Sequence, residues 1–167
     1  AAQMKLLKKD DTPDGVAIYS LYGEKRDRIV LVHQYRYAID DYIYEFPAGL
    51  VEKKEDYHDA AVRELREETG LKLELLNVPG YMEKPLYTTI GMTDECCAMV
   101  YGYASGTICT DGEEDSEEIE VVLVDRKEAK RILKEEKVAM MCAYMLMHFI
   151  ASEDPFYFLK CDEDRDI

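Results

Sequence analysis

The chain has 167 residues, which fits one domain with a substantial hydrophobic core. Its composition, 47% hydrophobic and 34% charged, is typical of a folded globular protein and not of a disordered one. The formal net charge of -15 argues against sequence-independent nucleic-acid binding, which needs a basic surface, and against attraction to anionic membranes.

The first predicted elements are strands. GVAIYSLY (15–22) and DRIVLVHQYRY (27–37) are rich in β-branched and aromatic residues, and the turn-like GEKR between them predicts a hairpin. YIYEF (42–46) predicts a third short strand, which the turn signal PAG ends.

A helix is predicted at residues 57–69. Asp56 precedes it as an N-cap residue, with Asp59 at the third helical position. Gly70 is placed to end the helix in the left-handed conformation that glycine adopts easily.

The second half predicts further strands and two helices. The apolar run VAMMCAYMLMHFIA (138–151) carries His148 and is too short to cross a bilayer comfortably, so we expect a buried helix and no membrane partner. We expect the whole chain, 1–167, to form one α+β domain in which a mixed β-sheet is sandwiched between α-helices. The other predicted elements are strands at 71–78, 80–87, 96–104 and 119–124, an acidic loop at 106–118 and an amphipathic helix at 125–136.

The cysteines and the N-terminus bear on location. The five cysteines are an odd number without C-x-x-C spacing, which favours reduced thiols over a disulfide framework or a zinc site. The opening AAQMKLLKKDD lacks the apolar core of a signal peptide. Together these features predict a cytoplasmic protein.

Three glutamates, Glu64, Glu67 and Glu68, share one face of the helix predicted at 57–69. Like charges four residues apart destabilise a helix slightly, so the cluster needs an explanation. It is either an ordinary solvated face or a site for a hard divalent cation, which binds to a few carboxylate oxygens beside water and phosphate.

The spacing around these glutamates decides between the two explanations. Gly49, five residues, Glu55, seven residues and then REL-R-EE-T-GL (63–71) match every fixed position of the Nudix box, GX5EX7REUXEEXGU with U aliphatic. The chain therefore resembles the Nudix hydrolases, a resemblance that implies the Nudix fold and an enzyme. Such enzymes cleave a nucleoside diphosphate linked to another group and use Mg²⁺ or Mn²⁺. Glu55 is expected to be structural more than ligating.

The resemblance also implies the roles of the box residues. Glu64, Glu67 and Glu68 would ligate the metal together with the backbone carbonyl of Ala48. Arg63 would orient the neighbouring glutamates through charge-assisted hydrogen bonds without touching the metal.

Sequence outside the box resembles the ADP-ribose pyrophosphatase group, from about residue 14 to residue 160, in DGVAIYSL, VLVHQYRY, YEFPAGLVE and DPFYFLK. That group hydrolyses ADP-ribose to AMP and ribose 5-phosphate and forms homodimers, so both properties are expected here. Two departures weaken the adenine preference. The N-terminal subdomain of the group is expected to be short, lost or trimmed here, and the chain has no tryptophan to stack on a base.

Four further residues take roles from the group. Arg36 would contact the substrate phosphates, which suit a planar guanidinium, and Glu45 and Glu95 would contact substrate. Glu117 matches a mobile-loop glutamate that acts as general base, although Glu113, Glu114 and Glu118 lie close by. The ordinary alternatives are an exposed arginine at a strand end, polar strand residues and a solvated acidic loop.

Three other functions stay open. A Nudix-like sensor would bind ADP-ribose without cleaving it, but such domains usually lose box carboxylates and this box is intact. A related hydrolase could act on another nucleoside diphosphate derivative or on nucleoside triphosphates. A structural acidic protein that binds divalent ions would leave the arginine and glycine of the box unexplained.

Overall fold

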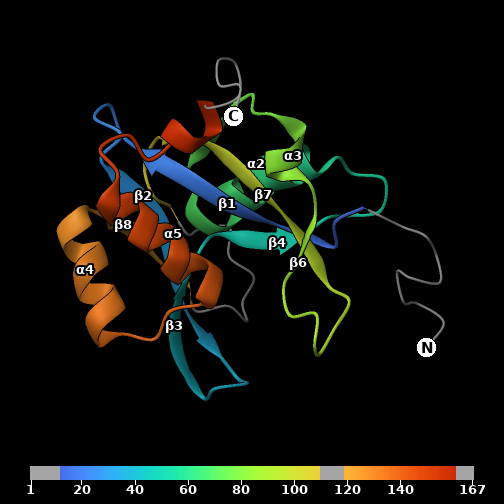
Figure 1. The fold of residues 1–167 in the computed structure, drawn as a ribbon, viewed down its shortest axis with the longest axis horizontal. Coiled ribbons are helices and arrows are strands. Elements are labelled where there is room, and N and C mark those ends of the chain that lie inside the picture. Colours follow the sequence, from blue (N-terminus) through green and yellow to red (C-terminus); the bar gives the residue numbers. More distant parts are fainter. Residues whose placement is uncertain (1–11, 110–118, 161–167) are drawn as a thin grey trace, which may run out of the picture.

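The computed structural model describes residues 12–109 and 119–160 (Figure 1). In this part of the chain, eight strands join one mixed sheet whose main path is β3-β2-β1-β7-β5. The strands are β1 (Gly15–Tyr22), β2 (Arg28–Arg36), β3 (Asp41–Glu45), β4 (Ala48–Leu50), β5 (Lys72–Leu75), β6 (Leu86–Tyr87), β7 (Cys96–Ser105) and β8 (Ile119–Val124). The helices are α2 (Tyr57–Thr69), α3 (Gly80–Glu83), α4 (Arg126–Glu135), α5 (Met140–Ala151) and the 3-10 helix η1 (Tyr157–Lys160).

Strand β1 organises the sheet. It runs parallel to β7 along its whole length and is buried on both faces, which explains its near-continuous apolar sequence. It pairs with β2 only beside the turn, at Leu21↔Ile29 and Tyr22↔Arg28, so the predicted hairpin forms but its strands then diverge. The first residues of β1 pair instead with β4. The end of β1 that begins at Gly15 therefore borders the segment that carries Gly49.

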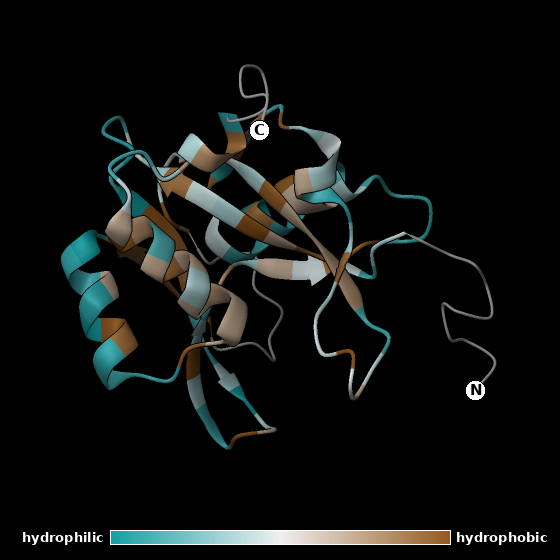
Figure 2. Ribbon diagram, in the orientation of Figure 1, coloured by the Kyte–Doolittle hydropathy of each residue, from teal (hydrophilic) through white to brown (hydrophobic). Residues whose placement is uncertain are grey.

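Helices cover both faces of the sheet, as predicted (Figure 1). Because side chains alternate along a strand, Val16 and Ile18 of β1 pack on one face in a cluster with α2, and Tyr19 packs on the other. This second cluster includes residues of α4, α5 and the C-terminal segment around Phe156. Figure 2 shows hydrophobic residues along β1 and β7 and mostly hydrophilic ones on the outer helix α4.

Helix α2 begins and ends at the predicted residues. The Asp56 carboxylate accepts a hydrogen bond from the backbone N–H of His58 at 2.9 Å and caps the first turn. Gly70 has φ of 74° and donates its N–H to the carbonyl of Arg66. The sheet-facing side of α2 buries Ala61 and Leu65, which leaves the box glutamates on other faces.

Two element predictions were wrong. Residues 80–87 form the short helix α3 and the two-residue strand β6, because Pro85 disfavours helical conformation at Lys84 and ends α3 there. The turn predicted after residue 46 is instead the strand β4, which is too short for its alternation to be visible in sequence.

Helix α5 is only half buried, which corrects the expectation of a buried helix. Cys142, Leu146 and Phe149 face the core. The opposite side leaves four large apolar side chains exposed: Met140, Met141, Tyr144 and Met147. Across the two described ranges, none of the helices has both the length and the hydropathy that crossing a bilayer requires.

Candidate active site

Gly49 lies in β4, where this strand pairs with the beginning of β1, and it is directly against the side chain of Glu64. A Cβ atom at Gly49 would stand 1.9 Å from Cδ of Glu64 and 2.2 Å from each carboxylate oxygen. Any side chain at position 49 would push the Glu64 carboxylate out of this place, so the glycine of the box acts here through close packing and not through an unusual backbone angle. The glycine thus lets the Glu64 carboxylate rest on the β4 backbone.

Arg63 joins the loop to the helix. Its Nε and Nη2 donate to the two oxygens of Glu55, each at 2.9 Å, and Nη2 also donates to the carbonyl of Leu50 at 3.0 Å. Its Nη1 donates to Glu64 at 2.7 Å and to Glu67 at 3.0 Å. One guanidinium therefore binds three carboxylates through charge-assisted hydrogen bonds.

The same contacts shape the acidity of the carboxylates. Hydrogen bonds from Arg63 and from the backbone N–H of Glu52 lower the pKa of Glu55 to about 2. Glu64 behaves differently, because it accepts one hydrogen bond from Arg63 where Glu55 accepts two. Burial raises the pKa of Glu64 even though Arg63 opposes the rise. Added positive charge beside Glu64 would relieve this desolvation.

Glu68 reaches the same strand. Its Oε2 accepts a hydrogen bond from the backbone N–H of Ala48 at 3.2 Å. Glu64 and Glu68 thus converge on the Ala48–Gly49 backbone, while Glu67 is turned toward Arg63. Within residues 12–109 and 119–160, no three or more Asp, Glu, His or Cys side chains gather as one metal-binding group.

This donor set fits a hard divalent cation. Mg²⁺ needs only one or two carboxylates beside water and phosphate oxygens, and the carboxylates of Glu64 and Glu68 both contact the Ala48–Gly49 segment. The carboxylate of Glu64 is desolvated where it packs on the backbone. Arg63 is the positive group that pairs with it. Oxygen donors of this kind favour Mg²⁺ or Mn²⁺ over softer metals.

Arg36 and Glu45 lie together across the hairpin formed by β2 and β3. The Nε of Arg36 donates to Oε2 of Glu45 at 2.7 Å. Gln34, which sequence reasoning missed, donates to the same oxygen at 2.9 Å and is 9% exposed. Its position two residues before Arg36 on a strand, and so on the same face, is the signal that could have found it. Glu45 lies three residues before Ala48 in the chain.

Glu95 lies at the end of the loop between β6 and β7, and its carboxylate accepts a hydrogen bond from Thr88 at 2.6 Å. The next strand, β7, pairs at Cys97 with Gly15 of β1, and Gly15 also pairs with Leu50 of β4. The loop therefore leaves the sheet at the same end as the glycine of the box.

The predicted base Glu117 and its neighbours Glu113, Glu114 and Glu118 lie outside the described residues.

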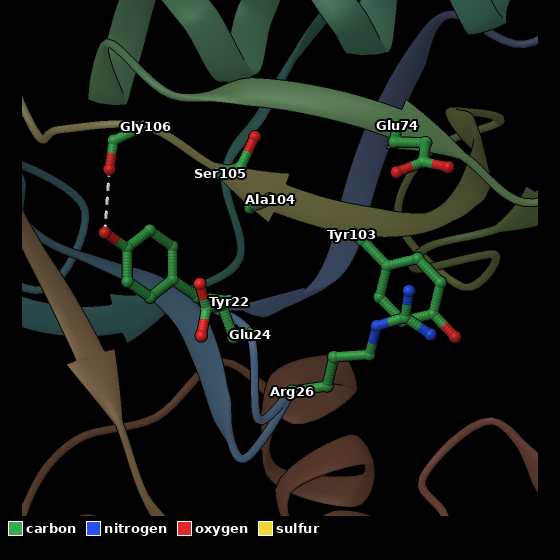
Figure 3. A pocket seen from close by; sticks show the side chains of 9 residues that line it. Tyr22, Glu24, Arg26, Glu74, Tyr103, Ala104, Ser105 and Gly106 are labelled. Atoms are coloured by element: carbon green, nitrogen blue, oxygen red, sulfur yellow. Dashed lines mark hydrogen bonds between the residues drawn. The ribbon is translucent and has the colours of Figure 1, made fainter.

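A pocket of about 480 Å³ opens at the opposite end of β1 (Figure 3). There the guanidinium of Arg26 stacks on the ring of Tyr103, 3.4 Å from its centroid, and Tyr22 donates to the carbonyl of Gly106 at 2.7 Å. None of the predicted site residues that the structure describes lines this pocket. It is therefore separate from the carboxylate site.

Comparisons with known proteins agree with this arrangement. A family model described as "NUDIX domain" matches residues 11–143. "Methanol dehydrogenase activator" of Bacillus methanolicus is 30% identical over 135 residues, and "ADP-ribose pyrophosphatase" of Bacillus subtilis is 30% identical over 127 residues. Each alignment covers 75% of this chain but 65% of the relative, so the chain spans less than two thirds of either relative's length.

A solved structure supports the fold. It is titled "Crystal structure of a hydrolase, NUDIX family from Clostridium perfringens" and superposes with a TM-score of 0.59 over 84% of this chain and 97% of that one. Its sequence is 17% identical, so the similarity concerns the fold alone.

Proposed function

Because the chain belongs to the Nudix family, we propose that it is a metal-dependent hydrolase of nucleoside diphosphate sugars. The proposed substrate is ADP-ribose, and the products are AMP and ribose 5-phosphate. The observation that carries the proposal is the convergence of Glu64 and Glu68 on the Ala48–Gly49 backbone, with Arg63 beside them. A solvated helix face would not need the glycine or the arginine.

The proposed metal ligands are Glu64, Glu68 and the carbonyl of Ala48, with Glu67 available once it leaves Arg63. A Mg²⁺ or Mn²⁺ ion bound there would offset the charge of the diphosphate and make water more acidic. Arg63 keeps its hydrogen bonds to Glu55 and Leu50, and so holds the loop against the helix during the reaction.

The chemical step is substitution at phosphorus. The oxygen of a water molecule forms a bond to one phosphorus atom, and the bond from that atom to the bridging oxygen breaks. The leaving phosphate keeps the electron pair, and a carboxylate takes the proton of the water. The resemblance to the group points to Glu117 as that carboxylate, with Glu113, Glu114 and Glu118 as the neighbouring alternatives outside the described residues.

The preference for ADP-ribose has two supports. Relatives from several organisms are named ADP-ribose pyrophosphatase, at modest identity to this chain. In addition, Arg36 lies close to the segment that precedes the box. Both Gln34 and Arg36 donate hydrogen bonds to Glu45 in this segment. A guanidinium suits the substrate phosphates, and a carboxylate suits the hydroxyl groups of a ribose.

We also propose a cytoplasmic homodimer. The exposed apolar side of α5 supports a subunit interface. The four cysteines within the described residues are free, which supports a reducing compartment.

The test is a product assay with Mg²⁺ or Mn²⁺ and a panel of ADP-ribose, other nucleotide sugars, diadenosine polyphosphates and nucleoside triphosphates. We expect AMP and ribose 5-phosphate from ADP-ribose. Glu64→Gln and Glu68→Gln should each lower kcat by roughly 10²-fold or more, because each removes a charge that acts on the reacting phosphates. Glu153→Gln, at an exposed position far along the chain, is the matched control and should be silent.

The outcomes separate the alternatives. Binding of ADP-ribose without product would favour a sensor, and turnover of triphosphates alone would favour the other class of Nudix hydrolase. Full turnover by Glu68→Gln in excess Mg²⁺ would contradict the assigned metal site.

A further inference from the structure

A buried carboxylate lies on α3, away from the box glutamates. Glu83 is 5% exposed, and its Oε2 lies 3.0 Å from Nε2 of His58 in the first turn of α2. Its other oxygen, Oε1, is buried and makes no hydrogen bond within the described part of the chain. Because a buried charge is costly without a partner, the position of α3 depends on His58.

His58 also bonds to a second carboxylate. Its Nδ1 lies 3.0 Å from Oδ1 of Asp56, the residue that caps α2. Ionised carboxylates only accept hydrogen bonds, and a neutral imidazole has a single N–H. The two contacts can therefore form together as hydrogen bonds only when His58 is protonated.

The surroundings favour that protonated form. Burial lowers the pKa of His58, but the hydrogen bonds to Glu83 and Asp56 outweigh it and raise the pKa above its ordinary value. The remaining titratable neighbours are Tyr57, whose ring stacks on His58, and Tyr101 of β7, which lies within electrostatic reach of Glu83. Phenols stay neutral in this pH range, so they do not compete for the proton.

Helix α3 is coupled by the chain to the loop that ends at Glu95. Only Lys84 and Pro85 separate Glu83 from β6, which pairs with the first residues of β7. Proline restricts the backbone around it, so this connection is short and stiff. The loop 88–95 between β6 and β7 leaves the sheet at the end that carries Gly49.

We propose that His58 and Glu83 are positioning residues for the substrate loop. Protonated His58 bridges Asp56 and Glu83, and so locks α3, and with it loop 88–95, against the first turn of the box helix. Loss of the proton breaks one of the two hydrogen bonds and releases the loop. The effect on substrate affinity rests on the function proposed above, whereas the effect on α3 does not.

The first experiment needs no substrate. NMR titration should follow His58, with His33 and His148 as internal references, while hydrogen exchange reports on residues 80–95. We expect the protection of this segment, measured relative to the intrinsic base-catalysed exchange rate at each pH, to fall as pH rises through the midpoint of His58. In Glu83→Gln the midpoint should move to lower pH, because the carboxylate that stabilises the imidazolium is gone. Protection of residues 80–95 that does not change when His58 loses its proton would overturn the proposal.

The second experiment measures KM for ADP-ribose between pH 6 and 9. Wild-type KM should rise by about 10-fold through the His58 midpoint, since displacement by a fraction of an ångström suffices for such a loss. His58→Gln cannot titrate and keeps at most one of the two hydrogen bonds, so its KM should be as high as that of the deprotonated wild type and should lose this pH dependence. His58→Ala should have a raised KM at every pH.

The same series of KM measurements includes a control variant and a result that would contradict the proposal. His148→Gln removes a histidine whose contacts with the carbonyl of Pro155 and the ring of Phe158 lie in its own C-terminal region, and should keep the wild-type profile. A profile that persists unchanged in His58→Gln would overturn the positioning role. If no compound of the panel is hydrolysed, the proposed function fails, but the titration and exchange results still decide whether the lock exists.

Discussion

At the residue scale, one arginine organises the site. Arg63 contacts Glu55, Glu64 and Glu67, and also the carbonyl of Leu50. The resemblance to the Nudix hydrolases implied that Arg63 orients its neighbours, and that role stays a prediction. Spacing could not predict that Glu67 turns toward Arg63 while Glu64 and Glu68 turn toward β4. Such choices depend on rotamers and on the local balance of charge.

Acid should weaken the ion pair between Arg63 and Glu55. The pKa of Glu55 is lowered to about 2 in the folded chain, so its stabilising contribution is complete above its ordinary pKa. The contribution is lost as pH falls from about 4.5 toward 2. We expect the Tm of Glu55→Gln to be below that of the wild type at pH 7, with the difference shrinking on acidification. Circular dichroism melts at pH 7, 5, 4 and 3 measure this.

Glu153→Gln, at an exposed position, is the control for that series. Its Tm should follow the wild type at every pH. A gap between Glu55→Gln and the wild type that stays constant down to pH 3 would contradict the assignment.

At the scale of elements, the sequence predicted long, strongly patterned segments well. Helix α2 has both its caps at the expected residues, and β1 and β8 have their expected bounds. The elements that were predicted wrongly are short. Helix α3 and strand β4 have four and three residues, so neither shows a full period, and tertiary contacts decide their conformation. The same reason hid Gln34 and Glu83, whose partners are distant in sequence.

The end of α2 offers a paired glycine test. Gly70 and Gly23 both have positive φ, 74° and 81°. A Cβ at Gly70 would also stand 2.6 Å from the carbonyl oxygen of Cys109, whereas a Cβ at Gly23 meets nothing within 4 Å. We expect Gly23→Ala to cost about 1 kcal/mol of unfolding free energy from backbone strain alone. Gly70→Ala should cost more, about 2–4 kcal/mol, because overpacking adds to the strain.

Urea denaturation measures both values. Equal losses in the two variants would show that the contact between Gly70 and Cys109 relaxes without cost. The activity of Gly23→Ala should be unchanged, because Gly23 lies in the turn at the far end of β1.

At the scale of the whole molecule, the Nudix fold predicted from the box is confirmed by the family match and by the superposed structure. The mixed sheet between helices follows from the order of the segments. The pairing of β1 with β7 does not, because local pattern carries no information about partners some 80 residues apart. The placement of loop 88–95 beside the box depends on that pairing.

The proposed dimer has a direct test on α5. Met147 is 51% exposed on the apolar side of the helix. Met147→Lys should place a charge in the interface and shift the protein toward monomer, because an unpaired buried charge opposes association. Sedimentation velocity over a range of concentrations measures the shift. Lys130→Glu, on the exposed side of α4, is the control and should leave the association unchanged.

The parallel pairing of β1 with β7 also has a consequence for how the chain is made. β1 lies near the N-terminus, yet its neighbour along its full length ends only at Ser105. On the ribosome, the first strand must therefore wait for most of the chain, and the box loop that rests on β1 waits with it. Such long-range contacts slow folding. Until β7 emerges, the apolar run of β1 is a natural target for chaperones.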